Sequence, residues 1–229
     1  MKKLLVFFII IAAGTMLYPL YSTFDGNDGL SDLAQYYAAT ENVQRVNSQN
    51  LVTAVVVTYR GLDTLGEVTI LFLTAAIIAF FLKKESETRT LRKNSEILKT
   101  SAKLLIPIIT MLGVYIFING HLTPGGGFQG GAVIASAVIL NLLAFPNEKI
   151  SHNFFESLES ISGIVYVGIA AFGAILGLGF LDNAILPLGK FGELFSAGAI
   201  PVIYSFVGLK VGAELSNILN KFKSVQADK

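Results

Sequence analysis

Long apolar runs alternate with polar segments along the chain. Six of these runs predict helices that cross a membrane, which need about 20 mostly apolar residues each. They lie at Leu4–Leu20, Thr58–Leu82, Leu104–Ile118, Ala132–Phe145, Ile161–Leu181 and Leu194–Leu215. The pattern therefore predicts an all-α integral membrane protein with six transmembrane helices.

The first apolar run and the two segments after it have less typical patterns. Leu4–Leu20 follows two lysines, as in a signal peptide. Its apolar character continues past the small residues that would mark a cleavage site, so we expect a retained helix. Tyr21–Asn50 is polar, with a short surface helix expected at Leu30–Tyr37. Leu51–Val57 is too short to span a membrane, and its pattern leaves open a half-helix or a strand-like re-entrant piece.

The basic residues predict the orientation of the chain. With the N-terminus inside, the inner segments hold thirteen Lys and Arg residues, and the outer segments hold only Arg45, Arg60 and Lys190. Because inner loops carry an excess of positive charge, we expect both termini in the cytoplasm. Residues 85–103 then form a charged cytoplasmic linker. It joins a two-helix module, residues 1–84, to a four-helix module, residues 104–229.

Composition excludes several classes of function. The chain is 53% hydrophobic and 14% charged, whereas a soluble domain carries about 25% charged residues. A net charge of +1 offers no basic field for nucleic acid. Cysteine is absent, and the two histidines lie 31 residues apart, which gives no metal-ligand spacing. We expect no cofactor and no catalytic residue in this chain, so any redox chemistry belongs to a partner.

A charged cluster precedes the second predicted span. Asp63 and Glu67 are four residues apart and share one face of a helix. Carboxylates in or near a membrane are costly, so each is a functional-site hypothesis by default. The alternative is a capping box from Thr64 to Glu67, with the acids at the positive end of the helix dipole. Capping does not account for two acids and Arg60 within eight residues, so both interpretations stay open.

Residues 120–131 interrupt the apolar pattern with a glycine-rich segment. Five glycines lie between Gly125 and Gly131. Neither a following Lys-Ser/Thr pair nor a preceding strand is present, which excludes a nucleotide-phosphate loop. The sequence leaves open a tight turn outside the membrane or a loop packed within the protein. Farther along, Lys210 interrupts the last predicted helix, and a snorkelling anchor is favoured there over a proton carrier.

Two segments resemble one family of membrane proteins. VTAVVVTYRGLDTLGE resembles the C-terminal part of the large A subunit of Mrp-type multisubunit Na+/H+ antiporters, which is also the separate E subunit of membrane-bound hydrogenases. NGHLTPGGGFQGG resembles the four-helix B subunit of the same antiporters. The chain is thus similar to a fusion of the two. The matching positions are Arg60, Asp63, Thr64, Glu67, His121, Pro124, Gly125, Gly126, Gly127, Phe128, Gly130 and Gly131.

The resemblance implies an accessory subunit in the cell membrane of a prokaryote that contributes to a sodium and proton path. Its partners would be antiporter-like and small Mrp-type subunits. Oxygen atoms of Asp63, Glu67 and Thr64 could bind Na+ transiently, as other hard cations are bound. One alternative places the same module in a ferredoxin-linked respiratory complex, a membrane-bound hydrogenase or sulfur reductase with iron–sulfur subunits. Another is a purely structural packing subunit.

Overall fold

The computed structural model describes residues 2–22, 29–82, 94–146, 152–176 and 178–225. Within these ranges the chain is mostly helical and has no β-strand. It divides into two compact units, residues 1–36 and 37–229. The first unit contains α1, Lys2–Ser22, which confirms a helix over the first apolar run. The short helix expected after it is α2, Asp32–Ala38.

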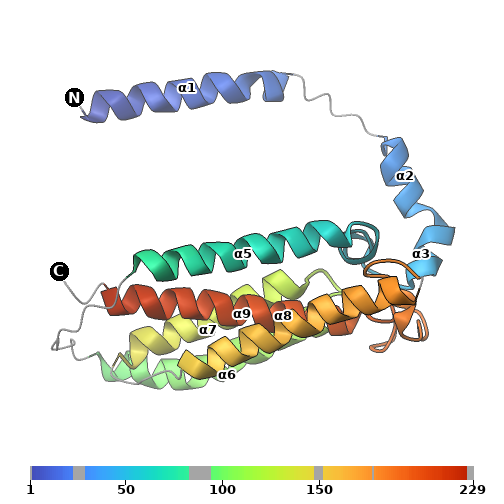
Figure 1. Cartoon of the computed structure of the whole chain (residues 1–229). Helices are drawn as coiled ribbons and strands as arrows, with labels where there is room; N and C mark the ends of the chain where they lie inside the picture. Colours follow the sequence, from blue (N-terminus) through green and yellow to red (C-terminus); the bar gives the residue numbers. More distant parts are fainter. Residues whose placement is uncertain (1, 23–28, 83–93, 147–151, 177, 226–229) are drawn as a thin grey trace. The chain divides into compact units, whose positions relative to one another are not determined.

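The second unit is a helical bundle organised around its last helix. This helix, α9 (Ile200–Val225), packs against α5 (Gly61–Phe81), α6 (Glu96–Ile118), α7 (Gly127–Ala144) and α8 (His152–Ile175). Figure 1 shows α5, α7 and α8 lying along α9. In α9, 61% of the most apolar stretch is buried inside the chain, against 11% in α5. The core of the protein therefore lies along α9, and α5 leaves most of its surface for lipid or other chains.

Five helices are long and apolar enough to cross a membrane among the described residues: Gly61–Phe81, Glu96–Ile118, Gly127–Ala144, Asn153–Ile175 and Ile200–Phe222. A shorter apolar helix, Val6–Pro19, lies within α1. The prediction of a helical membrane protein is confirmed. The sixth span and the orientation of the termini stay predictions.

Glycines allow α7 to pack closely on α9 and α6. A Cβ atom on Gly131 would lie 2.7 Å from the carbonyl oxygen of Gly208 on α9. A Cβ atom on Gly130 would lie 2.6 Å from the carbonyl oxygen of Gly113 on α6. Real side chains do not approach this closely, so only glycine allows the two backbones to come together here. The glycine-rich segment is thus packed within the protein. The fourth span begins at Gly127, rather than at Ala132 as predicted.

The segment before α5 is helical. Leu51–Ala54 forms α4, and Val55–Tyr59 continues it as a π-helix, η1. Arg60 interrupts the helix, with φ −123° and ψ 35°, and α5 begins at the next residue. The half-helix interpretation is confirmed and the strand-like one is wrong. Helix α3, Thr40–Val46, precedes α4 within the segment expected to be polar and irregular.

Four further helix boundaries differ from the predictions. Helix α6 begins at Glu96, eight residues before Leu104, because Ser95 caps it by accepting a hydrogen bond from the Leu98 N–H group. Pro107 therefore lies inside α6 and not in its first turn. Helix α8 runs from His152 to Ile175 and not from Ile161 to Leu181, and α9 starts at Ile200, later than the expected Leu194. The reason is that Ala197 and Gly198 have left-handed φ angles of 62° and 60°, so helical geometry begins only after them, with Pro201 in the first turn of α9.

Candidate functional site

The predicted charged cluster lies at the start of α5. Arg60 stands at the break between η1 and α5, and its guanidinium group pairs with the carboxylate of Asp63. Both side chains are more than half exposed. Glu67 is also exposed and lies six residues after the first residue of α5, which is about 9 Å along the helix axis at 1.5 Å per residue. The two acids thus differ: Asp63 has a cationic partner in the chain, and Glu67 extends from the apolar part of the helix.

Thr64 does not cap α5, so the capping-box interpretation is wrong. Its side chain is buried, and its hydroxyl donates a hydrogen bond of 2.7 Å to the carbonyl oxygen of Val56 in η1. The residue at the N-cap position is Arg60, and it makes no side-chain capping bond. Thr64 instead satisfies a backbone carbonyl group freed by the irregular turn. Its role is to connect η1 to α5 across the break.

Two buried tyrosines of the bundle lie within the electrostatic range of Glu67. Tyr166 of α8 and Tyr204 of α9 are 1% and 6% exposed, and the charge of Glu67 acts on both. The Tyr204 hydroxyl donates to Thr53 Oγ1 of α4 at 3.2 Å. The Tyr166 hydroxyl is buried without a hydrogen-bond partner in the described part of the chain. Polar groups therefore lead from Glu67 toward the interior.

Side chains from the first predicted module hold the glycine loop, residues 119–126. Asn50 Nδ2 donates to the carbonyl oxygens of Gly120 and Thr123 at 2.9 and 3.0 Å. Thr53 Oγ1 donates to the Gly120 carbonyl oxygen at 2.7 Å, and Ser48 Oγ donates to that of His121 at 3.0 Å. These bonds satisfy the carbonyl groups of an irregular segment that would otherwise be buried unpaired. The loop is therefore docked on α4.

His121, the ionisable residue of the glycine motif, is fully buried. Its Nε2 lies 3.4 Å from the carbonyl oxygen of Glu193, and Nδ1 has no hydrogen-bond partner among the described residues. Burial lowers the pKa of the imidazole, because desolvation disfavours its charged form. His121 is therefore neutral near pH 7. In the described ranges no hydrogen bond or ion pair joins it to Asp63 or Glu67.

The other residues of the glycine motif contribute to packing and not to a polar site. Phe128 is partly buried against the core cluster, and Pro124 is exposed. Gly126 and Gly127 lie against α9: a Cβ atom on either would meet Tyr204 or Val207. The remaining members are Gly125, Gly130 and Gly131, which approach α6 or α9. The glycine motif thus positions Tyr204 beside the loop.

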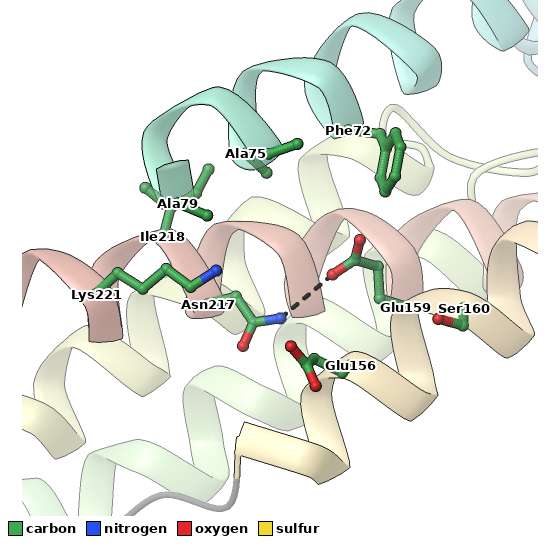
Figure 2. Close-up of a pocket in the computed structure, with 10 residues that line it drawn as sticks. Phe72, Ala75, Ala79, Glu156, Glu159, Ser160, Asn217, Ile218 and Lys221 are labelled. Atoms are coloured by element: carbon green, nitrogen blue, oxygen red, sulfur yellow. Dashed lines mark hydrogen bonds between the residues drawn. The ribbon is translucent and has the colours of Figure 1, made fainter. Parts of the chain in front are cut away.

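The sequence did not predict the most deeply buried charges in the protein. Lys210 Nζ lies 2.6 Å from Glu214 Oε1 on α9, and their side chains are 9% and 0% exposed. A snorkelling lysine would extend to the membrane surface, so that interpretation of Lys210 is wrong. Glu159 belongs to α8, and its Oε2 accepts a hydrogen bond of 3.2 Å from Asn217 Nδ2 (Figure 2). The i,i+4 spacing of Lys210 and Glu214 in an apolar helix is the signal that would have identified the pair.

The described residues contain no group of three His, Cys, Asp or Glu side chains that could hold a metal ion. The ionisable groups are instead spread along α5, α8 and α9. Several apolar helices with charged groups buried between them define a multi-pass membrane protein of the transport class, since charges at such positions are rare outside ion and proton routes.

Comparison with known proteins identifies the family. Residues 97–217 match the domain related to the MnhB subunit of Na+/H+ antiporters, and residues 1–99 match the MbhE family, the E subunit of MBH. The chain belongs to the Mrp antiporter-subunit family, as an MbhE-like part followed by an MnhB-like part. The predicted resemblance to a fusion of these two subunits is confirmed.

Individual relatives agree with this assignment. An uncharacterised protein of Methanocaldococcus jannaschii is 33% identical over 73% of this chain and 74% of its own length. A Staphylococcus aureus protein that carries the name antiporter subunit mnhB2 is 35% identical over 55% of this chain and 96% of its own.

Two solved structures share the fold. A chain in the membrane-bound sulfane sulfur reductase, an archaeal respiratory membrane complex, is 40% identical with a TM-score of 0.83. The match covers 96% of this chain and 97% of that one. A chain of the Mrp complex from Dietzia sp. DQ12-45-1b has a TM-score of 0.74 at 22% identity. That match covers 96% of this chain and 26% of the longer one.

Proposed function

We propose that this Mrp-type antiporter-module subunit contributes to the cation path of its complex, with Glu67 as the ion-binding carboxylate. The observation that carries the proposal is the position of Glu67. It lies inside an apolar helix, after an irregular turn, and its charge acts on two buried tyrosines. A charge kept at such a position requires a compensating function.

The contacts at the start of α5 divide the roles of the two acids. The ion pair with Arg60 occupies Asp63, so a sodium ion would have to displace a guanidinium group there. Glu67 makes no ion pair among the described residues, and its exposed carboxylate can accept a cation from a neighbouring subunit. A single carboxylate binds a monovalent cation weakly, which suits passage better than storage.

The membrane arrangement follows from the basic residues and the helix lengths. We propose that α1 is a sixth span and that both termini lie on the cytoplasmic side of a prokaryotic cell membrane. The absence of native cysteine makes this testable with single cysteines at exposed positions. A membrane-impermeant maleimide added to intact cells should label Lys190→Cys and leave Ser95→Cys unlabelled. Reversed labelling would contradict the orientation.

A second candidate is the same module inside a redox-linked respiratory complex. It is favoured by the match over nearly the full length of both chains to a subunit of the sulfane sulfur reductase complex. In that setting, electron transfer in other chains would drive ion movement through this one. Purification of the intact complex distinguishes the two candidates, because co-purifying iron–sulfur chains are expected only for the respiratory complex.

Substitution of Glu67 tests the proposed cation path. Glu67→Gln keeps the size of the side chain and removes its charge, so Na+-dependent proton movement in vesicles that hold the assembled complex should be lost. Glu193→Gln is the matched control, because Glu193 is an exposed acid in the loop before α9, where it pairs with Lys190. Unchanged transport in an assembled Glu67→Gln complex would contradict a role of Glu67 in the cation path.

A further inference from the structure

A buried ion pair lies in the middle of α9, away from Glu67 and the glycine loop. Lys210 Nζ and Glu214 Oε1 are 2.6 Å apart. Burying both charges is unfavourable because each loses its hydration, and their attraction only partly offsets that loss. Helix packing alone does not require these residues, because apolar side chains of similar size would pack as well. The pair is therefore a candidate for a role in ion movement.

A second carboxylate, that of Glu159, lies near the Lys210–Glu214 pair and adds a negative charge to it. Glu159 of α8 interacts electrostatically with Glu214 across the helix contact. Glu214 Oε1 accepts from Lys210, but Oε2 is buried and has no hydrogen-bond partner in the described part of the chain. One ammonium group and two carboxylates leave a net charge of −1. Glu214 is fully buried and Glu159 is partly exposed, so the excess negative charge is unfavourable chiefly at the buried Glu214 carboxylate. A single added proton makes the group of three neutral, and Glu214 Oε2 is a free position for it.

Two cavities between α5, α8 and α9 border this group through Glu159 and Lys210, and Glu214 is not among their lining residues. The first, the Lys221 cavity, has a volume of about 310 Å³, and Glu156, Asn217 and Lys221 contribute its polar lining (Figure 2). The second, the Tyr166 cavity, has a volume of about 410 Å³ and is lined by Thr69, Tyr166 and Lys210. Each is large enough for several water molecules. Glu159 lines both cavities, so a proton on its carboxyl group is within reach of either one.

Phe72 of α5 stands at the same junction. It lines both cavities, and its ring centroid lies 5.1 Å from Lys210 Nζ. A cation over an aromatic face is stabilised by the ring quadrupole. Lys210 therefore keeps a favourable contact when the charge of Glu214 is removed. The lysine can stay charged and in place while a proton arrives on its partner.

We propose that Glu159, Lys210 and Glu214 form a proton-transfer site within the membrane part of this subunit. The proton leaves the protonated carboxyl group of Glu159 and binds Oε2 of Glu214. Glu159 becomes the carboxylate, to which Asn217 donates, and Lys210 keeps its charge throughout. The three side chains are neutral in sum before and after the step, so no net charge is created in the bilayer. The site extends the proposed transport function and rests on it.

The surroundings favour a proton over a sodium ion. The Lys210 ammonium group already occupies the position beside Glu214 Oε1 that a metal cation would take, and it would repel a second full charge at close range. The other titratable groups around the site are Glu156 and Tyr166 on α8 and Lys221 on α9. Helix α5 contributes no titratable side chain to either cavity, and its nearest charge in this direction is Glu67, which acts on Tyr166.

Chemical labelling of the intact wild-type complex tests the site without any variant. Dicyclohexylcarbodiimide reacts with protonated carboxyl groups in apolar surroundings. Mass spectrometry of treated membranes should find the adduct on Glu159 or Glu214, and not on the exposed Glu96 that pairs with Lys99 at the start of α6. Labelling should decrease as the pH rises and should not respond to NaCl. Protection by NaCl at constant pH and ionic strength would overturn the proposal in favour of a sodium site.

Substitutions at Glu214 in the same complex test whether the site is needed for proton movement. Glu214→Gln should lower the rate of proton movement by about a hundredfold, the lower end of what a positioned proton acceptor contributes. Glu96→Gln is the matched control and should leave the rate unchanged. Glu214→Asp, which keeps the carboxyl group, should restore part of the rate, which a packing role would not predict.

The outcomes separate this proposal from the proposed function. Loss of transport in Glu67→Gln, with full transport in Glu214→Gln and no labelling at Glu159 or Glu214, overturns the proton-transfer site alone. Full transport in both assembled variants overturns both. If Glu214→Gln fails to assemble, the labelling result on the wild-type complex decides: an adduct at Glu159 or Glu214 supports the site, and its absence overturns it.

Discussion

Replacing Gly131 with alanine should separate two helices at the centre of the bundle. The added Cβ atom would lie 2.7 Å from the carbonyl oxygen of Gly208 and 2.8 Å from Cβ of Val211, where ordinary contacts begin at 3.4 Å. Helices α7 and α9 must therefore move apart by about 0.7 Å, the difference between 3.4 and 2.7 Å. Overpacking of this kind costs about 1–3 kcal/mol. Neither atom can move away by side-chain rotation, because one is a backbone oxygen and the other is a Cβ atom, whose position the backbone fixes.

Gly168→Ala is the matched control for this change. Gly168 also lies inside a helix, α8, but a Cβ atom there would meet nothing within 4 Å. It should gain up to about 1 kcal/mol from the higher helix propensity of alanine. The assay is the unfolding temperature of the purified complex, followed by loss of the assembled peak in size-exclusion chromatography. A chain of this size shifts by about 2–4 °C per kcal/mol. Equal unfolding temperatures for the two variants would refute the close packing of α7 on α9.

Three further predictions concern buried polar groups. Lys210→Met should cost about 3–5 kcal/mol, because it leaves Glu214 buried without its partner; the double variant Lys210→Met/Glu214→Gln should recover most of this in the same thermal assay. His121 has a lowered pKa when folded, so the unfolded chain binds its proton more readily. Its contribution to stability is complete above about pH 6.5 and is lost as the pH falls through that value toward the folded pKa. His121→Asn should therefore weaken the fall in unfolding temperature on acidification, and an unchanged pH profile would contradict the buried neutral imidazole. Asn50→Ala removes two hydrogen bonds to the glycine loop and should cost about 1–3 kcal/mol. Faster amide hydrogen exchange at residues 119–126 would report it, and unchanged exchange would show that the loop does not depend on Asn50.

Part of the candidate site was predictable from local sequence because its residues are neighbours in the chain. Arg60, Asp63 and Glu67 are at the start of a helix in the structure, as their spacing indicated. The outcome for Thr64 was not predictable: the sequence matches a capping box, but the helix begins three residues earlier and the hydroxyl bonds to Val56. A capping motif specifies which bonds are possible, whereas the irregular turn before it decided which one forms.

The glycine-rich segment is a second case in which local sequence and tertiary packing favour different structures. From the sequence, residues 125–131 indicated an irregular loop, because glycine is a poor helix former in isolation. In the structure Gly127, Gly130 and Gly131 are helical. Contacts with α6 and α9 outweigh the unfavourable propensity, and only glycine lets these backbones approach. Propensity is a local quantity of about 1 kcal/mol for a residue, and packing against two helices exceeds it.

The sequence alone determined the class of protein, the number and approximate places of the long helices in the second unit, and the two motifs that identify the family. Each of these depends on the order of residues within about twenty positions, which is the range over which hydropathy and helix signals act. The tertiary structure decided which charges are buried together. Glu159 and Glu214 are 55 residues apart in the chain, and only the packing of α8 on α9 brings their carboxyl groups to one place.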